Sequence, residues 1–318
     1  MFGSLPCIPV SHGMSCHITK LLRKLDHQTE GEKMNYMTPI WLRYPEVERD
    51  SIEWRMGLGE EYIARWIAWK KQLPADEKRE YDELFPVPVL WQGYFPGTKV
   101  CKEYHHGSFT MPLWRNKGLP KYSLRKLQLS EQEEPAEYCF FWGHHPAADG
   151  SITKACFSQW WKSYFISYGV PYCCMEQYMM AQKAELFGDK EIHKQILACD
   201  DPAEIKKLGR RVRKFDASVW DQAKYSIVLN GNWKKFSQNP QLRDFLLSMG
   251  DQILVEASPY DTIWGIGLSA DQAAAGPQSW RGENLLGFAL MEVRDELKRV
   301  YAHANLLTEI EFSSAKKG

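Results

Sequence analysis

The sequence predicts an α+β fold in which helices predominate. Several segments repeat apolar residues at helical spacing and begin or end at recognisable capping residues. Between them stand short apolar runs bounded by glycine or proline, which are typical of strands. Hydrophobic residues make up 44% of the 318-residue chain and charged residues 25%, which is the composition of a folded, globular protein.

Composition and patterning divide the chain into four predicted regions. Residues 1–35 are polar and are expected to be poorly ordered. Residues 36–137 are predicted to be an N-terminal extension of Trp-rich helices and short strands. Residues 138–300 are more strongly patterned and are predicted to be the main domain, and 301–318 a C-terminal tail.

In the N-terminal extension, Tyr62, Trp66 and Trp69 stand at helical spacing, and Pro74 is expected to end that helix. A second short helix is predicted up to Pro86, and short strands and turns follow over 87–112. Adjacent histidines in a strand face opposite sides, so His105 and His106 are not expected to share a metal ion. The acidic run 130–137 is expected to be a solvated connector.

The main domain is predicted to open with a strand over 138–144 and strand segments over 156–172, with a turn at Tyr168–Gly169. A mainly apolar helix, 172–190, follows and ends at Gly188, a suitable left-handed cap. Further helices are predicted to begin at Asp201, near Asp216 and at Asn239.

The domain is predicted to close with a strand over 252–258 and a final helix over 282–301. The buried stripe expected for that helix consists of Leu286, Leu290, Val293, Leu297 and Val300.

Charge and cysteine usage exclude several classes of protein. Lys plus Arg and Asp plus Glu both number 40, which argues against a protein that coats nucleic acid or an anionic membrane over a wide surface. No apolar run approaches the roughly 18 residues of a membrane span. None of the eight cysteines forms a C-x-x-C pair and no signal peptide is recognisable, so free thiols in the cytoplasm are expected. Cys7, Cys16 and His17 match no zinc pattern, and no metal or cofactor is predicted.

The helix 172–190 carries the candidate catalytic pair. Glu176 and Lys183 fall on one stripe with Met180 and Phe187, roughly 10 Å apart along the axis. Burial among apolar side chains raises the pKa of a carboxyl group, as a general acid or base near neutral pH requires. The alternative is structural: Glu176 would pair with an arginine of another helix.

Three further stretches have the character of ligand-binding segments. In 260–267, Trp264 can stack on a base, and Gly265 permits close backbone approach. Arg281 precedes a helix N-terminus, a favourable place for phosphate. Residues 206–214 form a basic run. The structural alternatives are a turn with a buried tryptophan, a solvated arginine and a solvated helix face.

Taken together, these stretches resemble the NADAR family, also called the YbiA-like N-glycosidases. The resemblance covers about 138–300 and includes, in family order, "FFWGHHP", "CFSQWW", "MEQYMMAQKAELF", "LGRRVRKFD", "VWDQAKYSIVLNGNWKKFSQNPQLRDFLL", "LVEASPYDTIWGIGLS" and "WRGENLLGFALMEVRDEL". It implies a catalytic domain that cleaves the N-glycosidic bond between ribose C1 and a base. The family glutamate and lysine of the E-[HQ]-Y-x-x-x-Q-K helix map to Glu176 and Lys183.

The resemblance also implies roles for other residues. Arg210 and Arg281 are expected to hold phosphate and Trp264 to stack on the base or sugar. The second-rank pocket residues are Trp142, His144, Ser158, Trp160, Asp261 and Asn284. Two positions depart from the family: Gln177 stands where many members have histidine, and Gln159 changes the F-S-N-F segment.

Three functions remain open at this stage. The preferred one is removal of ADP-ribose from guanine bases of nucleic acid, which implies a local contact with nucleic acid. The second is hydrolysis of phosphoribosylamino-pyrimidine intermediates of riboflavin synthesis. The third is a non-catalytic module that binds ADP-ribose or NAD, which the departures at Gln177 and Gln159 would suit. Residues 36–137 are either a partner-binding region or part of one integrated fold.

Overall fold

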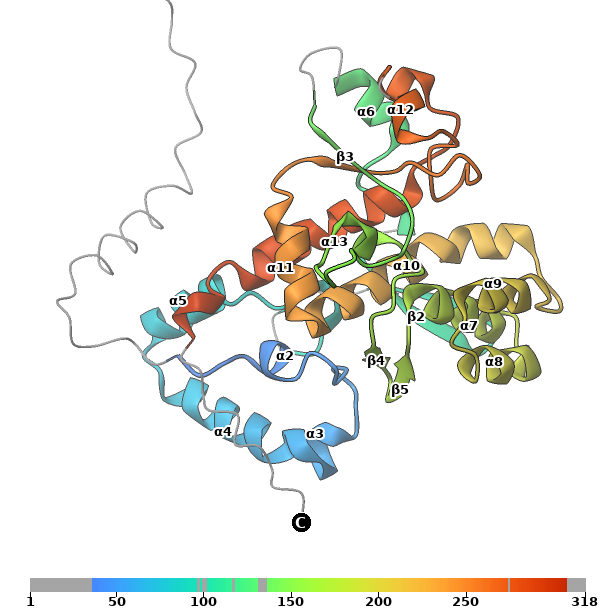
Figure 1. The fold of residues 1–318 in the computed structure, drawn as a ribbon. Helices are drawn as coiled ribbons and strands as arrows, with labels where there is room; N and C mark the ends of the chain where they lie inside the picture. Colours follow the sequence, from blue (N-terminus) through green and yellow to red (C-terminus); the bar gives the residue numbers. More distant parts are fainter. Residues whose placement is uncertain are drawn as a thin grey trace, which may run out of the picture. The chain divides into compact units, whose positions relative to one another are not determined.

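The computed structural model describes residues 36–95, 98, 102–115, 118–130, 136–273 and 275–307 (Figure 1). Residues 38–304 form one compact unit, and residues 1–37 with 305–318 form another. In the second unit, Tyr36 and Leu307 are joined by an isolated parallel bridge. The predictions for 1–35, for most of the acidic run and for the chain after 307 lie outside the described residues.

The prediction of a mainly helical α+β fold is confirmed. The described residues contain three two-stranded sheets, and helices make up most of the rest of the regular structure (Figure 1). None of these helices combines the length and the apolar character needed to cross a membrane.

The N-terminal part is helical and rich in tryptophan. Its elements are α2 (Ile40–Arg43), α3 (Glu53–Met56), α4 (Leu58–Gln72), α5 (Ala75–Leu84) and η1 (Val89–Trp91). The helix predicted to end before Pro74 is split at Gly57, where the backbone is extended. Trp41 packs edge-on against Trp66 at 5.8 Å, and Trp54 packs against Trp91 at 5.6 Å. These rings form the core of this part, and Trp66 is the member of the predicted helical repeat that joins it.

A β-hairpin follows, made of β1 (Lys102–His106) and β2 (Phe109–Leu113). His105 lies 3.1 Å from the Thr110 hydroxyl, whereas the ring of His106 packs against Phe187. The two histidines therefore face different neighbours, as predicted. The helix α6 (Leu124–Ser130) comes next.

Two more sheets position the main domain. Strand β3 (Tyr138–Phe141) pairs in parallel with β6 (Ile253–Glu256), with Phe141 opposite Glu256. Because the two strands run in the same direction, the segments after Phe141 and after Glu256 leave the sheet at one edge. After η3 (Lys154–Phe157), β4 (Phe165–Ser167) and β5 (Val170–Tyr172) form a hairpin. Its turn holds Tyr168 at φ 48° and Gly169 at φ 73°, which confirms the predicted turn.

Helices make up the rest of the main domain. They are α7 (Met175–Leu186), α8 (Lys190–Leu197), α9 (Pro202–Arg210), α10 (Ala217–Gln238), α11 (Pro240–Ser248), α12 (Ala270–Ala273), η4 (Pro277–Ser279), α13 (Leu285–Tyr301) and η5 (Ala304–Leu306). The predicted caps are confirmed: Asp201 accepts from the Glu204 amide at 2.9 Å, and Gly188 is left-handed. The predicted stripe of α13 is fully buried where the helix packs on α10 and β6. Helix α8, capped by Asp189, was not predicted.

The N-terminal part contacts α10 and α13 of the main domain. Glu48 forms an ion pair with Lys234, and the Trp114 indole donates to the Asn230 side chain at 2.8 Å. The Val89 amide donates to the Glu296 carboxylate at 2.7 Å. A division of the chain near residue 137 remains a prediction.

Candidate active site

A cleft of about 200 Å³ lies between helices α7 and α9 and the segment that follows β6. It contains acids, cations and aromatic rings. Its lining consists of Ser158, Gln159, Trp160, Glu176, Met179, Met180, Lys183, Lys206, Gly209, Arg210, Trp220, Glu256, Asp261, Ile263 and Trp264.

Glu176 lies in the first turn of α7 and is only 3% exposed. Its amide donates to the Gln159 carbonyl at 2.8 Å, which ties the start of α7 to the segment 158–160. Burial raises the pKa of the Glu176 carboxyl to about 7, against the opposing effects of Lys206, a hydrogen bond from Trp160, and Arg210. In the described part of the chain Glu176 forms no ion pair with an arginine, so nothing supports the structural alternative for this residue.

Lys183 lines the same cleft two turns further along α7. Its ammonium donates to the Gly209 carbonyl at 2.9 Å and lies 4.3 Å from the centre of the Phe215 ring. Burial lowers the pKa of Lys183, which the nearby Glu176 carboxylate partly restores. Gly209 permits this contact, because a Cβ there would lie 2.0 Å from the sulfur of Met180. The predicted pair therefore shares one cleft.

The segment 158–160 forms a second wall, held from behind by a buried lysine. Lys235 is fully buried and donates to the carbonyls of Cys156 and Ser158, at 2.6 and 3.1 Å. Burial lowers the pKa of Lys235 to about 8. The Ser158 hydroxyl accepts from the Trp160 amide at 3.1 Å. Two predicted binding residues, Ser158 and Trp160, thus belong to the lining.

The segment after β6 forms the third wall. The Asp261 carboxylate accepts from the amides of Ile263 and Trp264, at 2.9 and 2.8 Å, so it fixes a turn that brings Trp264 to the cleft. A Cβ on Gly265 would lie 2.8 Å from the Glu256 carbonyl. Gly265 therefore permits the loop to pack on the end of the strand.

Two predicted residues, His144 and Trp142, lie next to the lining. The His144 ring packs on Trp160 at 5.2 Å, and burial, followed by the charge of His145, lowers the pKa of His144. Trp142 is 58% exposed and lies 6.3 Å from the exposed ring of Tyr260. Both residues follow β3. They lie at the end of the sheet from which the loop that contains Asp261 also departs.

Two other predicted residues are not brought into the cleft. Asn284 is fully buried behind it, where its side chain accepts from the Glu256 amide at 3.0 Å and donates to the Leu254 carbonyl at 2.9 Å. Arg281 is exposed, and its amide donates to the Ile266 carbonyl. Asn284 thus fixes the end of β6, and the phosphate role of Arg281 remains a prediction.

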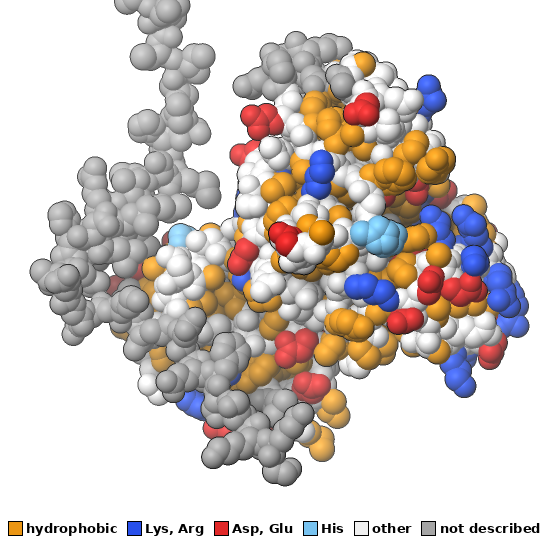
Figure 2. All heavy atoms as spheres, viewed as in Figure 1, with side chains coloured by type: hydrophobic (Ala, Val, Ile, Leu, Met, Phe, Trp, Pro, Cys, Tyr) orange, Lys and Arg blue, Asp and Glu red, His pale blue; other side chains and the backbone are white. Residues whose placement is uncertain are grey.

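Sequence reasoning missed Glu256, Lys206 and Trp220, all of which line the cleft. Burial, followed by the charge of Asp261, raises the pKa of Glu256 to about 8. The available signal for Glu256 was an acid at the end of an apolar strand, directly before the loop that carries Trp264. Lys206 belongs to the basic run 206–214, from which the family resemblance pointed to Arg210 alone. Figure 2 shows Lys and Arg side chains gathered over α8 and α9.

The two departures from the family pattern have different locations. Gln177 faces away from the cleft: its side chain donates to the carbonyls of Ile196 and Cys199 at 3.1 and 2.7 Å, and accepts from the Cys173 amide. It therefore holds the C-terminal end of α8. Gln159 lines the cleft, and its buried Oε1 has no hydrogen-bond partner among the described residues.

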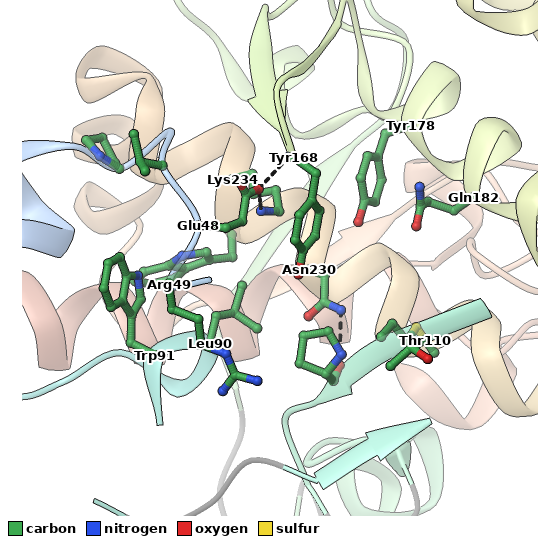
Figure 3. Close-up of a pocket in the computed structure, with 15 residues that line it drawn as sticks. Glu48, Arg49, Leu90, Trp91, Thr110, Tyr168, Tyr178, Gln182, Asn230 and Lys234 are labelled. Carbon is green, nitrogen blue, oxygen red and sulfur yellow. Dashed lines mark hydrogen bonds and ion pairs between the residues drawn. The ribbon is translucent and has the colours of Figure 1, made fainter. Parts of the chain in front are cut away.

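A second cavity of about 60 Å³ lies on the other side of α7 (Figure 3). Tyr178 and Gln182 face it from α7, at helical positions opposite Glu176. Its charged residues are paired: Glu48 forms an ion pair with Lys234 and accepts from the Tyr168 amide at 2.7 Å.

The residues that line the cleft all fall within the part of the chain that matches known proteins. The family model of the NADAR domain matches residues 140–298. An N-glycosidase of Acanthamoeba polyphaga mimivirus is 47% identical over 169 residues, which cover 51% of this chain and 98% of that protein. An N-glycosidase of Nostoc punctiforme is 36% identical over 126 residues, 40% of this chain and 74% of that protein.

The solution structure of the Escherichia coli protein YbiA is 25% identical, with a TM-score of 0.42 over 51% of this chain and 85% of that one. The family match and the mimivirus relative, which aligns over nearly its whole length, are sufficient to place the sequence. The chain therefore belongs to the NADAR domain family and, with these relatives, to the N-glycosidases.

Proposed function

We propose that the chain hydrolyses the N-glycosidic bond between a ribose and a base, and that its substrate is guanine of nucleic acid carrying ADP-ribose. The observation on which this rests is Glu176, a carboxyl group buried in the cleft without an arginine partner in the described chain. Burying such a group is costly, and a site that acts on a positively charged transition state gives it a use.

In the proposed reaction the bond from C1 of the ribose to the base breaks and positive charge develops on the sugar. The ionised Glu176 carboxylate stabilises this charge and accepts a proton from the attacking water. With its pKa near 7, Glu176 is about half ionised at neutral pH.

Two roles fit Lys183. Its ammonium can donate a proton toward the leaving base, or its amine can add to the aldehyde of an opened sugar and form an imine. Burial favours the neutral amine, which is the nucleophilic form. Borohydride reduction during turnover separates the two roles: a covalent adduct at Lys183 identifies the imine, and full activity with no adduct excludes it.

Three features support the choice of substrate. Lys206 and Arg210 line the cleft and carry the positive charge that a pyrophosphate requires. An exposed arginine, Arg211, continues beyond them, whereas Lys207 and Arg213 are paired with Glu204 and Asp189. The aromatic rings of Trp160 and Trp264 in the cleft offer stacking surfaces, and exposed Trp142 and Tyr260 offer more next to it.

The test compares substrates. The purified chain is incubated with an oligonucleotide carrying ADP-ribosylated guanine and, separately, with phosphoribosylamino-pyrimidine intermediates of riboflavin synthesis, and released product is separated by chromatography. We expect release of ADP-ribose from the oligonucleotide and its loss in Glu176→Gln. Faster cleavage of the pyrimidine compounds would reject the guanine substrate. Tight ADP-ribose binding in a calorimeter without turnover of any compound would reject catalysis altogether.

A further inference from the structure

Glu256 ends strand β6, and its backbone is fixed on several sides. Its amide donates to the Asn284 side chain at 3.0 Å, and its carbonyl accepts from the Ile266 amide at 3.0 Å. In the sheet it stands opposite Phe141 of β3. A backbone held in this way aims the side chain at one place, and that place is the cleft.

One oxygen of the Glu256 carboxyl group lacks a partner. Its Oε2 is buried and makes no hydrogen bond with any described residue. Three charged groups act on it: Asp261 from the loop after β6, Lys206 from α9 and Glu176 from α7. Burial and the two carboxylates favour its protonated form, with a pKa of about 8. A proton carried on Oε2 at neutral pH therefore has no acceptor among the described residues. A buried donor of this kind is expected to find its acceptor in a ligand.

Glu176 and Glu256 reach the cleft from different elements, α7 and β6. Trp264 stands in the loop that follows β6, and this loop is held against the end of the strand by the bond from the Ile266 amide to the Glu256 carbonyl. A base stacked on Trp264 would therefore have its leaving atoms on the Glu256 side. The sugar would then lie toward Glu176. Two carboxyl groups that flank the scissile bond, one protonated and one ionised, are the arrangement glycosidases use for acid and base.

We propose that Glu256, and not Lys183, is the acid that protonates the leaving base; this inference rests on the proposed function. As the bond between C1 and the base breaks, its electron pair stays with the base, and the base takes the proton of the Glu256 carboxyl group. Water supplies hydroxide to C1 and gives its other proton to Glu176. The products are the free sugar hydroxyl and the neutral base, and proton exchange with solvent restores both carboxyl groups.

The test is the pH profile of base release by Glu256→Gln, Glu256→Asp and the wild-type chain. We expect kcat of Glu256→Gln to fall by about 10²- to 10⁴-fold, the usual contribution of a general acid. The wild-type rate is expected to decline above pH 8 as Glu256 ionises, and this alkaline decline should vanish in Glu256→Gln. Glu256→Asp keeps a carboxyl group and is expected to retain the decline at a reduced rate. Affinity for ADP-ribose, measured by calorimetry, should stay within about threefold, because binding does not require the proton.

The matched control is Glu283→Gln, an exposed glutamate close to Asn284, which should behave as wild type. The role of Glu256 is overturned if Glu256→Gln retains wild-type kcat, or if it is slow but keeps the alkaline decline. If Glu176→Gln abolishes base release while Glu256→Gln does not, only this inference fails. If the wild-type chain releases no base from any of the substrates, the proposed function fails and the role of Glu256 fails with it.

Discussion

The two cavities on opposite sides of α7 differ in how their polar groups are satisfied. In the cavity of Figure 3, Glu48 is paired with Lys234, and Arg49 donates to the Gln92 carbonyl and to Glu103. In the cleft, the Oε2 of Glu256 and the Oε1 of Gln159 have no partner among the described residues. An unsatisfied buried polar atom costs about 1–3 kcal/mol, so such atoms persist where a ligand satisfies them. Among the described residues that line the two cavities, unpaired buried atoms of this kind occur only in the cleft. This difference favours the cleft as the place of the proposed reaction, even though one helix lines both cavities.

The largest effect is expected for Glu176→Gln. The substitution removes the charge and the base but keeps the shape, so kcat should fall by roughly 10³- to 10⁴-fold while the melting temperature stays the same or rises, since a costly buried acid is lost. Steady-state base release and a thermal melt measure both quantities. A variant that retains a tenth of the wild-type rate would show that Glu176 is not the catalytic group.

The placement of the predicted catalytic pair was foreseeable from the sequence, whereas the contrast in pairing was not. Helical spacing placed Glu176 and Lys183 on one stripe, and caps such as Asp201 and Gly188 marked where helices begin and end. The sequence could not show which buried groups are paired, because pairing depends on partners far along the chain. Lys234 meets Glu48 across 186 residues.

The same limit explains why the sequence predicts Asn284 in the pocket and does not predict Glu256 there. Asn284 was expected in the pocket, yet it lies one layer behind and holds Glu256 in place. Nothing in the spacing of "QILVEAS" indicates that a loop and two helices would enclose the final acid of this strand. Enclosure of this kind is a property of tertiary packing, which periodicity in one segment does not encode.

A loss of stability without a loss of catalysis is expected for Glu48→Ala. It leaves Lys234, which is 7% exposed, as a buried charge without its carboxylate. Removing one partner of a buried ion pair costs about 3–5 kcal/mol in the free energy of unfolding. Urea denaturation measures this loss, with exposed Glu83→Ala as the matched control. The kcat of the folded variant should remain within twofold of wild type, and a large fall would mean that the cavity of Figure 3 takes part in catalysis.

The free energy of unfolding should fall as the pH rises, because Glu256 is buried in its protonated form. A carboxylate in a salt bridge has the opposite effect on the pH dependence. The pKa of Glu256 is about 8 in the folded chain, against a usual value of 4.5, so the folded protein holds a proton that the unfolded chain has released. Its contribution to stability is complete below pH 4.5 and is lost as the pH rises through 8. Between pH 6 and pH 9 the free energy of unfolding should therefore fall by about 3 kcal/mol more in wild type than in Glu256→Gln. Parallel slopes in urea titrations at the two pH values would contradict an acid buried in protonated form.

The smallest effect is expected at Gln177, a departure from the family pattern that lies on the side of α7 away from the cleft. Its amide donates to the carbonyls of Ile196 and Cys199, which end α8. Gln177→Ala should lower the free energy of unfolding by about 1–2 kcal/mol, because these carbonyls lose their donor, and kcat should not change. Gln177→His restores the common family residue with one ring N–H for the same carbonyls, so it should recover part of that stability. Hydrogen exchange of the α8 amides and steady-state kinetics test the two expectations separately. A rate increase in Gln177→His would mean that this position contributes to the reaction. Both sides of α7 would then take part in catalysis.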